Sequence, residues 1–95
     1  MVPGLLGLQN SKKIVPYYTS TSGYSSFYEM PSGIYFLSGL AANELSDKPY
    51  TSLGRCIWIY NNYKDERVGL LICSKDGKTY GGYCFGRNAL TWVPK

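Results

Sequence analysis

Residues 54–86 constrain the fold of this 95-residue chain more than any other stretch. They contain three runs rich in aliphatic and aromatic residues, 54–60, 68–74 and 79–86, and polar segments separate these runs. Short runs of this composition predict strands. Asp76-Gly77 supplies the positive φ that a tight hairpin turn requires. The sequence therefore predicts a three-stranded antiparallel meander.

Alternation along the first of these strands assigns its side chains to two faces. Cys56, Trp58 and Tyr60 point to one face, and Ile57 and Ile59 to the other. Both faces are apolar enough to be at least partly buried, which in so small a domain indicates a sandwich or an oligomer. The polar residues 61–67 predict an exposed seven-residue connection, and Gly69 predicts a bulge in the second strand.

The rest of the chain offers few helical signals. Prolines and glycines in residues 1–16 exclude a long helix there, so we expect an N-terminal arm with a short edge strand at 13–15. Residues 17–28 are rich in Tyr and Ser and fit either an adaptable contact surface or an aromatic linker. Residues 34–37 predict a strand, 40–45 at most one helical turn, and 89–93 a last strand.

The predicted fold class is all-β, a small antiparallel sandwich or knob built on the meander, with little or no helix. Residues 1–30 are expected to form the arm and the Tyr/Ser-rich segment, and residues 31–95 a β-rich knob-like domain. Ten tyrosines suit a β domain with a binding face, or a subunit that buries aromatic rings against its own copies.

Composition limits the classes of function. The net charge of +4 is mild and its basic residues are spread along the chain, so it indicates solubility and not a nucleic-acid surface. No apolar run reaches the ~20 residues that cross a bilayer, and the apolar start lacks the preceding basic residues of a signal peptide. We expect neither membrane insertion nor export.

No catalytic or metal-binding constellation is present in the sequence. The chain has no histidine, which excludes Ser-His-Asp and Cys-His arrangements. Cys56, Cys73 and Cys84 have no Cys-x-x-Cys spacing, and they fit buried reduced thiols, or one cross-strand disulfide with a free thiol left over. We therefore expect no enzyme activity, no cofactor and no metal site.

Several short motifs resemble the knob domains of phage tail fibres, the pyocin-knob-like family. They are the run Pro31-Ser32-Gly33-Ile34-Tyr35-Phe36, the strand Arg55-Cys56-Ile57-Trp58-Ile59-Tyr60, Lys78-Thr79-Tyr80 followed by Gly86-Arg87, and a tryptophan near the end. The similarity covers residues 31–95. The third strand departs from the family, because Leu70-Leu71-Ile72-Cys73 replaces its usual glutamine.

The resemblance implies a phage virion protein, made in the host cytoplasm and then placed in the tail. It implies a non-catalytic homotrimer at the fibre tip that contacts host-surface carbohydrate or other virion proteins. Aromatic rings would stack on sugars and polar side chains would bind their hydroxyls. The candidate binding residues are Tyr60, Asn61, Asn62, Tyr63, Lys64, Arg67, Tyr24 and Tyr28.

Two other functions fit the same sequence. The first is a small phage-encoded protein that inhibits a host or defence protein by direct binding. The second is a single-strand nucleic-acid binder that stacks bases on strand aromatics such as Trp58 and Tyr60.

Overall fold

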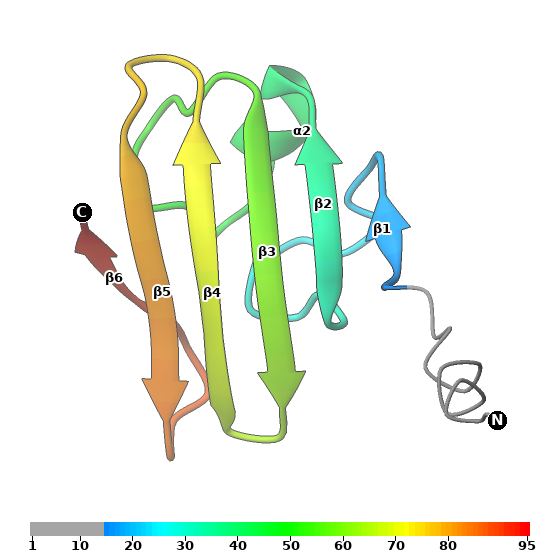
Figure 1. The fold of residues 1–95 in the computed structure, drawn as a ribbon, viewed down its shortest axis with the longest axis vertical. Coiled ribbons are helices and arrows are strands. Elements are labelled where there is room, and N and C mark those ends of the chain that lie inside the picture. The colour runs from blue at the N-terminus through cyan, green and yellow to red at the C-terminus, as the bar shows by residue number, and fades with distance from the viewer. Residues whose placement is uncertain (1–14) are drawn as a thin grey trace, which may run out of the picture.

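The computed structural model describes residues 15–95, which form one six-stranded sheet (Figure 1). The strands are β1 (Tyr17–Tyr18), β2 (Gly33–Leu37), β3 (Cys56–Tyr63), β4 (Glu66–Cys73), β5 (Thr79–Phe85) and β6 (Thr91–Pro94). Their order in the sheet follows the sequence. β1 is parallel to β2 and every other neighbouring pair is antiparallel. The all-β prediction is confirmed, and the helix α2 (Gly39–Asn43) is a single short turn as expected.

The predicted meander is present as β3, β4 and β5, and the alternation of its faces is confirmed. The connection between β3 and β4 is shorter than predicted. Only Lys64 and Asp65 form the turn, with Lys64 at φ 50°, because the polar residues on either side continue the ladder down to the pair Tyr63–Glu66. A ladder is made by backbone groups, so polar side chains did not end it.

Strand β1 forms the edge of the described sheet next to β2. The expected arm and most of the expected edge strand at 13–15 fall on residues 1–14, outside the described part of the chain. Val15 is exposed and lies before β1. The carbonyl of Pro16 accepts a hydrogen bond from the Ile34 amide at 3.0 Å, which brings Tyr17 and Tyr18 alongside β2.

One face of the sheet is covered by irregular chain and α2, which lie behind the strands in Figure 1. The covering segments are residues 19–32 and 38–55. The first brings Phe27 and Met30 to the core, and the second brings Ala42, Leu45 and Leu53. They pack on the sheet residues Tyr35, Leu37, Cys56, Trp58, Tyr60, Leu71, Cys73 and Tyr80. The core therefore lies between one sheet and a layer of loops.

Asp47 ties the two covering segments to each other and to β6. Its carboxylate accepts hydrogen bonds from the amides of Phe27 at 2.7 Å and Tyr28 at 3.1 Å. Its backbone carbonyl accepts from the Trp92 indole at 2.7 Å. Side-chain bonds to backbone groups replace the regular ladder that these loops lack.

Gly69 and Gly82 face each other across β4 and β5, and neither lies at a bulge. The predicted bulge at Gly69 is wrong, because the pairing of β3 with β4 is uninterrupted. Glycine is needed at both positions because a side chain there would clash with a tryptophan ring. A Cβ at Gly69 would meet the Trp58 ring at 2.5 Å, and one at Gly82 would meet the Trp92 ring at 2.8 Å. The two indoles lie 5.3 Å apart, with the Phe27 ring edge-on to both.

Candidate binding surface

The face of the sheet opposite the core has no covering layer among residues 15–95, and we call it the open face. Strand alternation and cross-strand register assign its residues. Its apolar side chains are Tyr17, Ile34, Phe36, Ile57, Ile59, Val68, Leu70, Ile72, Tyr83, Phe85 and Val93. Several are well exposed, with Phe36 at 46%, Ile59 at 43% and Phe85 at 74%. A surface of this kind is unusual for a protein that acts without a partner.

The side chains that β2, β3 and β4 place in the middle of the open face are uncharged. One row across the sheet runs through Ile34, Ile59, Leu70, Gly81 and Val93, which are paired in register. The next row joins Phe36, Ile57, Ile72 and Thr79 in the same way. Alternation of apolar residues towards such a face is the pattern of an inner face in a sandwich.

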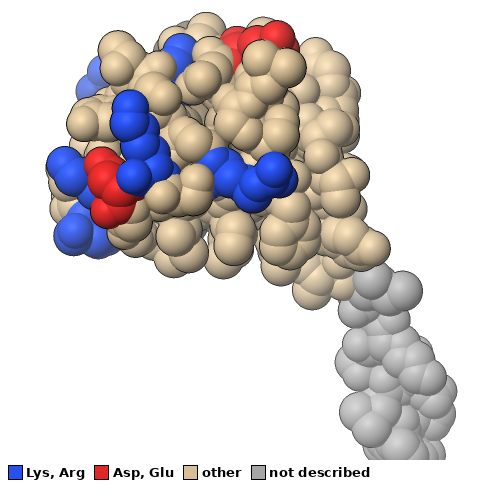
Figure 2. Space-filling view, turned by 90° about the horizontal axis from the view of Figure 1, so that it is seen from above, with Lys and Arg blue, Asp and Glu red and all other residues tan. Residues whose placement is uncertain are grey.

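Charged residues lie at the two ends of the open face and on its β5–β6 side. Arg55 precedes β3 at one end. The Lys95 side chain lies over Gly81, in the row of Ile59 and Leu70, with its Nζ 3.6 Å from where a Cβ would stand. Glu66 begins β4 at the opposite end. Figure 2 looks onto the end where β3 begins and shows basic side chains beside acidic ones and uncharged residues. The surface seen there is not a continuous basic field.

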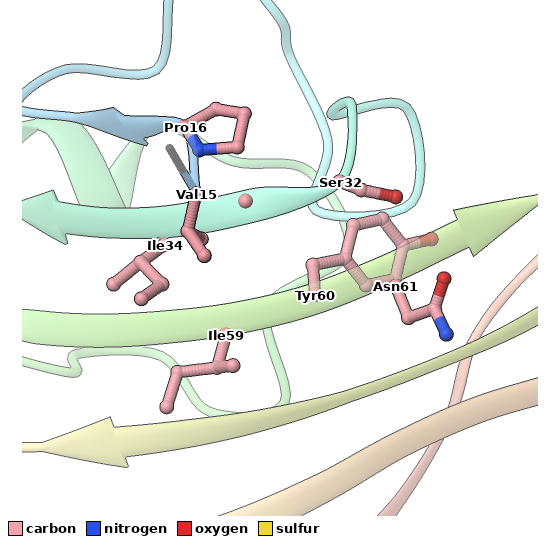
Figure 3. Close-up of a pocket in the computed structure, with 8 residues that line it drawn as sticks. Val15, Pro16, Ser32, Ile34, Ile59, Tyr60 and Asn61 are labelled. Atoms are coloured by element: carbon pink, nitrogen blue, oxygen red, sulfur yellow. The ribbon is translucent and has the colours of Figure 1, made fainter. Parts of the chain in front are cut away.

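Hollows run along the open face between β2, β3 and β4. The largest, about 450 Å3, lies between the segment before β1 and strands β2 and β3 (Figure 3). The side chains of Val15, Ile34 and Ile59 lie on one side of the sheet there, with Asn61 beyond them. A second hollow of about 330 Å3 adjoins it between β3 and β4. Apolar side chains of a partner would fit these hollows.

Four of the predicted binding residues come together, but on the covered face. The carbonyl of Tyr28 accepts hydrogen bonds from the Tyr60 hydroxyl at 2.9 Å and from the Arg67 guanidinium at 2.6 Å. The guanidinium also lies 3.9 Å from the centre of the Tyr28 ring. Asn62 donates to the carbonyl of Met30 at 2.7 Å. These side chains hold the covering segment 19–32 on the sheet.

The other predicted binding residues are exposed. Asn61 and Tyr63 lie on the open-face side of β3, near the hairpin turn, and Tyr63 is 62% exposed. The Lys64 ammonium lies 5.3 Å from the centre of the Tyr63 ring. Tyr24 lies in the segment 19–32 and is 39% exposed. Asn61, Tyr63 and Lys64 form what we call the hairpin tip.

The three cysteines are free and buried. Cys56 and Cys73 face each other across β3 and β4. Burial, with a further contribution from Cys73, raises the pKa of the Cys56 thiol to about 12. Burial also raises the pKa of Cys73. Thiols with such pKa values stay protonated near neutral pH and are poor nucleophiles.

Residues 15–95 contain no group of three or more side chains of the types that ligate metals. Within the same range, no helix has the length and apolar character needed to span a bilayer.

Comparisons with protein-family models, with curated proteins and with solved structures found no match to this chain.

The open face is the feature that the sequence indicated only in part. Two apolar faces were visible in the alternation of β3, but nothing in the pattern distinguished the face that the loops cover.

Proposed function

We propose that this chain is a non-catalytic binding module whose open face docks on a protein surface. We further propose that it acts as a component of a phage virion during host attachment. The observation that supports a binding role is the open face, which is largely apolar and solvent-exposed. The phage setting rests on the resemblance to tail-fibre knobs.

The size of the open face supports a partner. Strands lie about 4.8 Å apart and rise about 3.3 Å per residue, so β2–β6 present a face on the order of 500 Å2. Exposed apolar patches larger than a few hundred Å2 mark interaction sites, since a stable monomer gains nothing from leaving them in water. The copies of a virion protein would meet through such a face, and the resemblance implies three copies.

The hairpin tip is the proposed contact with host-surface carbohydrate. Tyr63 offers an exposed ring, while Asn61 and Lys64 offer hydrogen-bond groups beside it. The tip lies at one end of the sheet, next to the open face and not at its centre.

An array of bacterial lipopolysaccharides, capsular polysaccharides and teichoic acids tests this function. We expect labelled protein to bind at least one polysaccharide, and Tyr63→Ala to weaken that binding about tenfold, or about 1.4 kcal/mol. Tyr50→Ala is the matched control, because Tyr50 is also exposed and lies under a lysine, with Lys78 5.7 Å from its ring. Absence of binding by the unmodified protein, or equal binding by Tyr63→Ala, would contradict the carbohydrate role.

A phage-encoded inhibitor of a host or defence protein is the second candidate, and the open face also favours it. An inhibitor of this kind would form a one-to-one complex with its target. Ile59→Lys would break that complex, because it places a charge in the middle of the open face. The same protein would bind no polysaccharide on the array.

A further inference from the structure

We infer that a second copy of this chain covers the open face, so that two sheets pack face to face as a two-fold sandwich with their strands running in opposite directions. The inference rests on the proposed function, because it names the partner of the face proposed there for binding. Each copy supplies one layer, and the new core forms between them.

The composition of the open face suits contact with itself. The chain carries a net charge of +4, so most pairs of surfaces from two copies repel each other. Around Ile59 and Phe36 the open face has no charged side chain, and the Lys95 ammonium lies over Gly81, towards β6. Two copies that meet around Ile59 both gain from removing apolar area from water.

The area of the open face matches what a stable pair needs. Two copies that each cover a face on the order of 500 Å2 bury on the order of 1,000 Å2 in total. The uneven side-chain surface has a larger area than the flat sheet and adds to this value. Specific interfaces begin at about this size. An isologous contact uses the same patch in both copies, so no second apolar patch is required.

The width of the sheet favours two copies over three. Packed sheets lie about 10 Å apart, so each sheet sits about 5 Å from the middle plane of a sandwich. In a triangular trimer, sheets about 24 Å wide would stand about 7 Å from the three-fold axis. The residues at the centre of the open face are Ile59, Leu70 and Gly81, which are too short to fill that extra depth.

The charges at the ends of the open face select the relative direction of the two sheets. Arg55 lies at the end where β3 begins, and Glu66 lies at the opposite end. A two-fold axis across the strands places unlike ends together, with Arg55 of each copy near Glu66 of the other. An axis along the strands would place like charges together, which is unfavourable.

Light scattering and sedimentation of the full chain from 1 to 100 μM test the inference. We expect a mass about twice 10.6 kDa. Ile59→Lys should give a monomer with an unchanged circular dichroism spectrum, because it adds a charge at the centre of the open face. Leu40→Lys is the matched control and should remain a dimer, since Leu40 is 75% exposed on α2 behind the sheet.

Charge reversal tests the direction of the sheets. Arg55→Glu and Glu66→Arg should each weaken the dimer about three- to tenfold, and the double variant should recover most of that loss. Glu44→Arg, at an exposed position next to α2, should leave the dimer unchanged. Weakening by both single changes without recovery in the double variant would overturn the antiparallel arrangement.

A trimer, or a monomer at 100 μM, would overturn the two-fold pairing. The array separates this failure from a failure of the carbohydrate role, because binding at Tyr63 does not require the dimer. A monomer that binds polysaccharide through Tyr63 contradicts the second copy alone. A dimer that binds no polysaccharide contradicts the carbohydrate role alone.

Discussion

Gly69 and Gly82 set how closely the tryptophans approach the sheet. In each case the position of a Cβ is taken by an indole ring, Trp58 over Gly69 and Trp92 over Gly82. Neither glycine has the positive φ that would require glycine for backbone reasons. The absence of a side chain at these two places allows Trp58 to be fully buried at the centre of the core.

Gly69→Ala is expected to lower the free energy of unfolding by about 1–3 kcal/mol, the usual cost of overpacking. Its methyl group would meet Trp58 at 2.5 Å and the carbonyl oxygen of Ile59 at 2.8 Å, and the backbone oxygen cannot move aside. Gly81→Ala in β5 is the control, because the closest atom to its methyl group would be the flexible Cε of Lys95, at 3.1 Å, while the nearest backbone atom, the carbonyl oxygen of Val93, lies at 3.9 Å. Urea unfolding of both variants measures the difference. Equal losses in the two would contradict the role of Gly69.

The covering segments depend on a few side chains because they have almost no regular structure of their own. Asp47, Tyr60, Asn62 and Arg67 each bond to backbone groups of residues 27–30. These bonds satisfy amides and carbonyls that would otherwise be buried without partners. The layer opposite the sheet is thus fixed by specific polar contacts as well as by Phe27 and Met30.

Asp47→Ala is expected to destabilise the fold by about 1–3 kcal/mol, since it leaves the amides of Phe27 and Tyr28 without their acceptor. The covering segment should loosen first. Hydrogen exchange of those two amides should therefore accelerate more than that of β3. Glu44→Ala, an exposed acidic residue nearby in sequence, should change neither stability nor exchange. Unchanged exchange at Phe27 and Tyr28 in Asp47→Ala would contradict this role.

In the molecule as a whole, one face of the sheet is buried under the covering segments and the other face is exposed to solvent. The groups whose pKa burial raises all lie on the covered side of the sheet: Tyr35, Cys56, Tyr60, Cys73 and Tyr80. Each is neutral when folded, and each ionises more easily in the unfolded chain. Because all five groups lie in or beside the core, the packing of the core determines how the free energy of unfolding changes at high pH.

The free energy of unfolding is expected to fall as the pH rises from about 9 to 12. Unfolded cysteines and tyrosines lose protons from about pH 9.0 and 10.0, whereas burial raises the pKa of Cys56 and Tyr60 to about 12 in the folded protein. The folded state then binds more protons than the unfolded state, so stability is full below pH 9 and is lost above it. Urea unfolding with a reductant at pH 8, 10 and 11 measures this.

The variant Tyr60→Phe tests whether the raised pKa of Tyr60, and not general alkaline damage, contributes to the loss of stability at high pH. It removes the hydroxyl that donates to Tyr28, so it should be less stable at pH 8 but lose less stability by pH 11. Tyr50→Phe, at an exposed position, should keep the pH dependence of the unmodified protein. A Tyr60→Phe curve parallel to that of the unmodified protein would contradict the assignment.

Local patterns allowed the strands to be predicted, but not the site. Alternation in β3 and the Asp76-Gly77 turn were readable because each depends on near neighbours in the sequence. The roles of Tyr60, Asn62 and Arg67 were not readable, because their partners Tyr28 and Met30 lie 30 or more residues away. The polar stretch 61–67 was predicted as a loop from its side chains, but the backbone ladder continues through it to the pair Tyr63–Glu66.

The sequence by itself determined the all-β meander and the alternation of its two faces, because these follow from side-chain type and from spacing two residues apart. Only the tertiary structure decided which face is covered. The covering segments 19–32 and 38–55 carry no periodic pattern, and they are placed by long-range contacts of Phe27, Met30 and Asp47 with the sheet and with each other. The open face is what those contacts leave exposed.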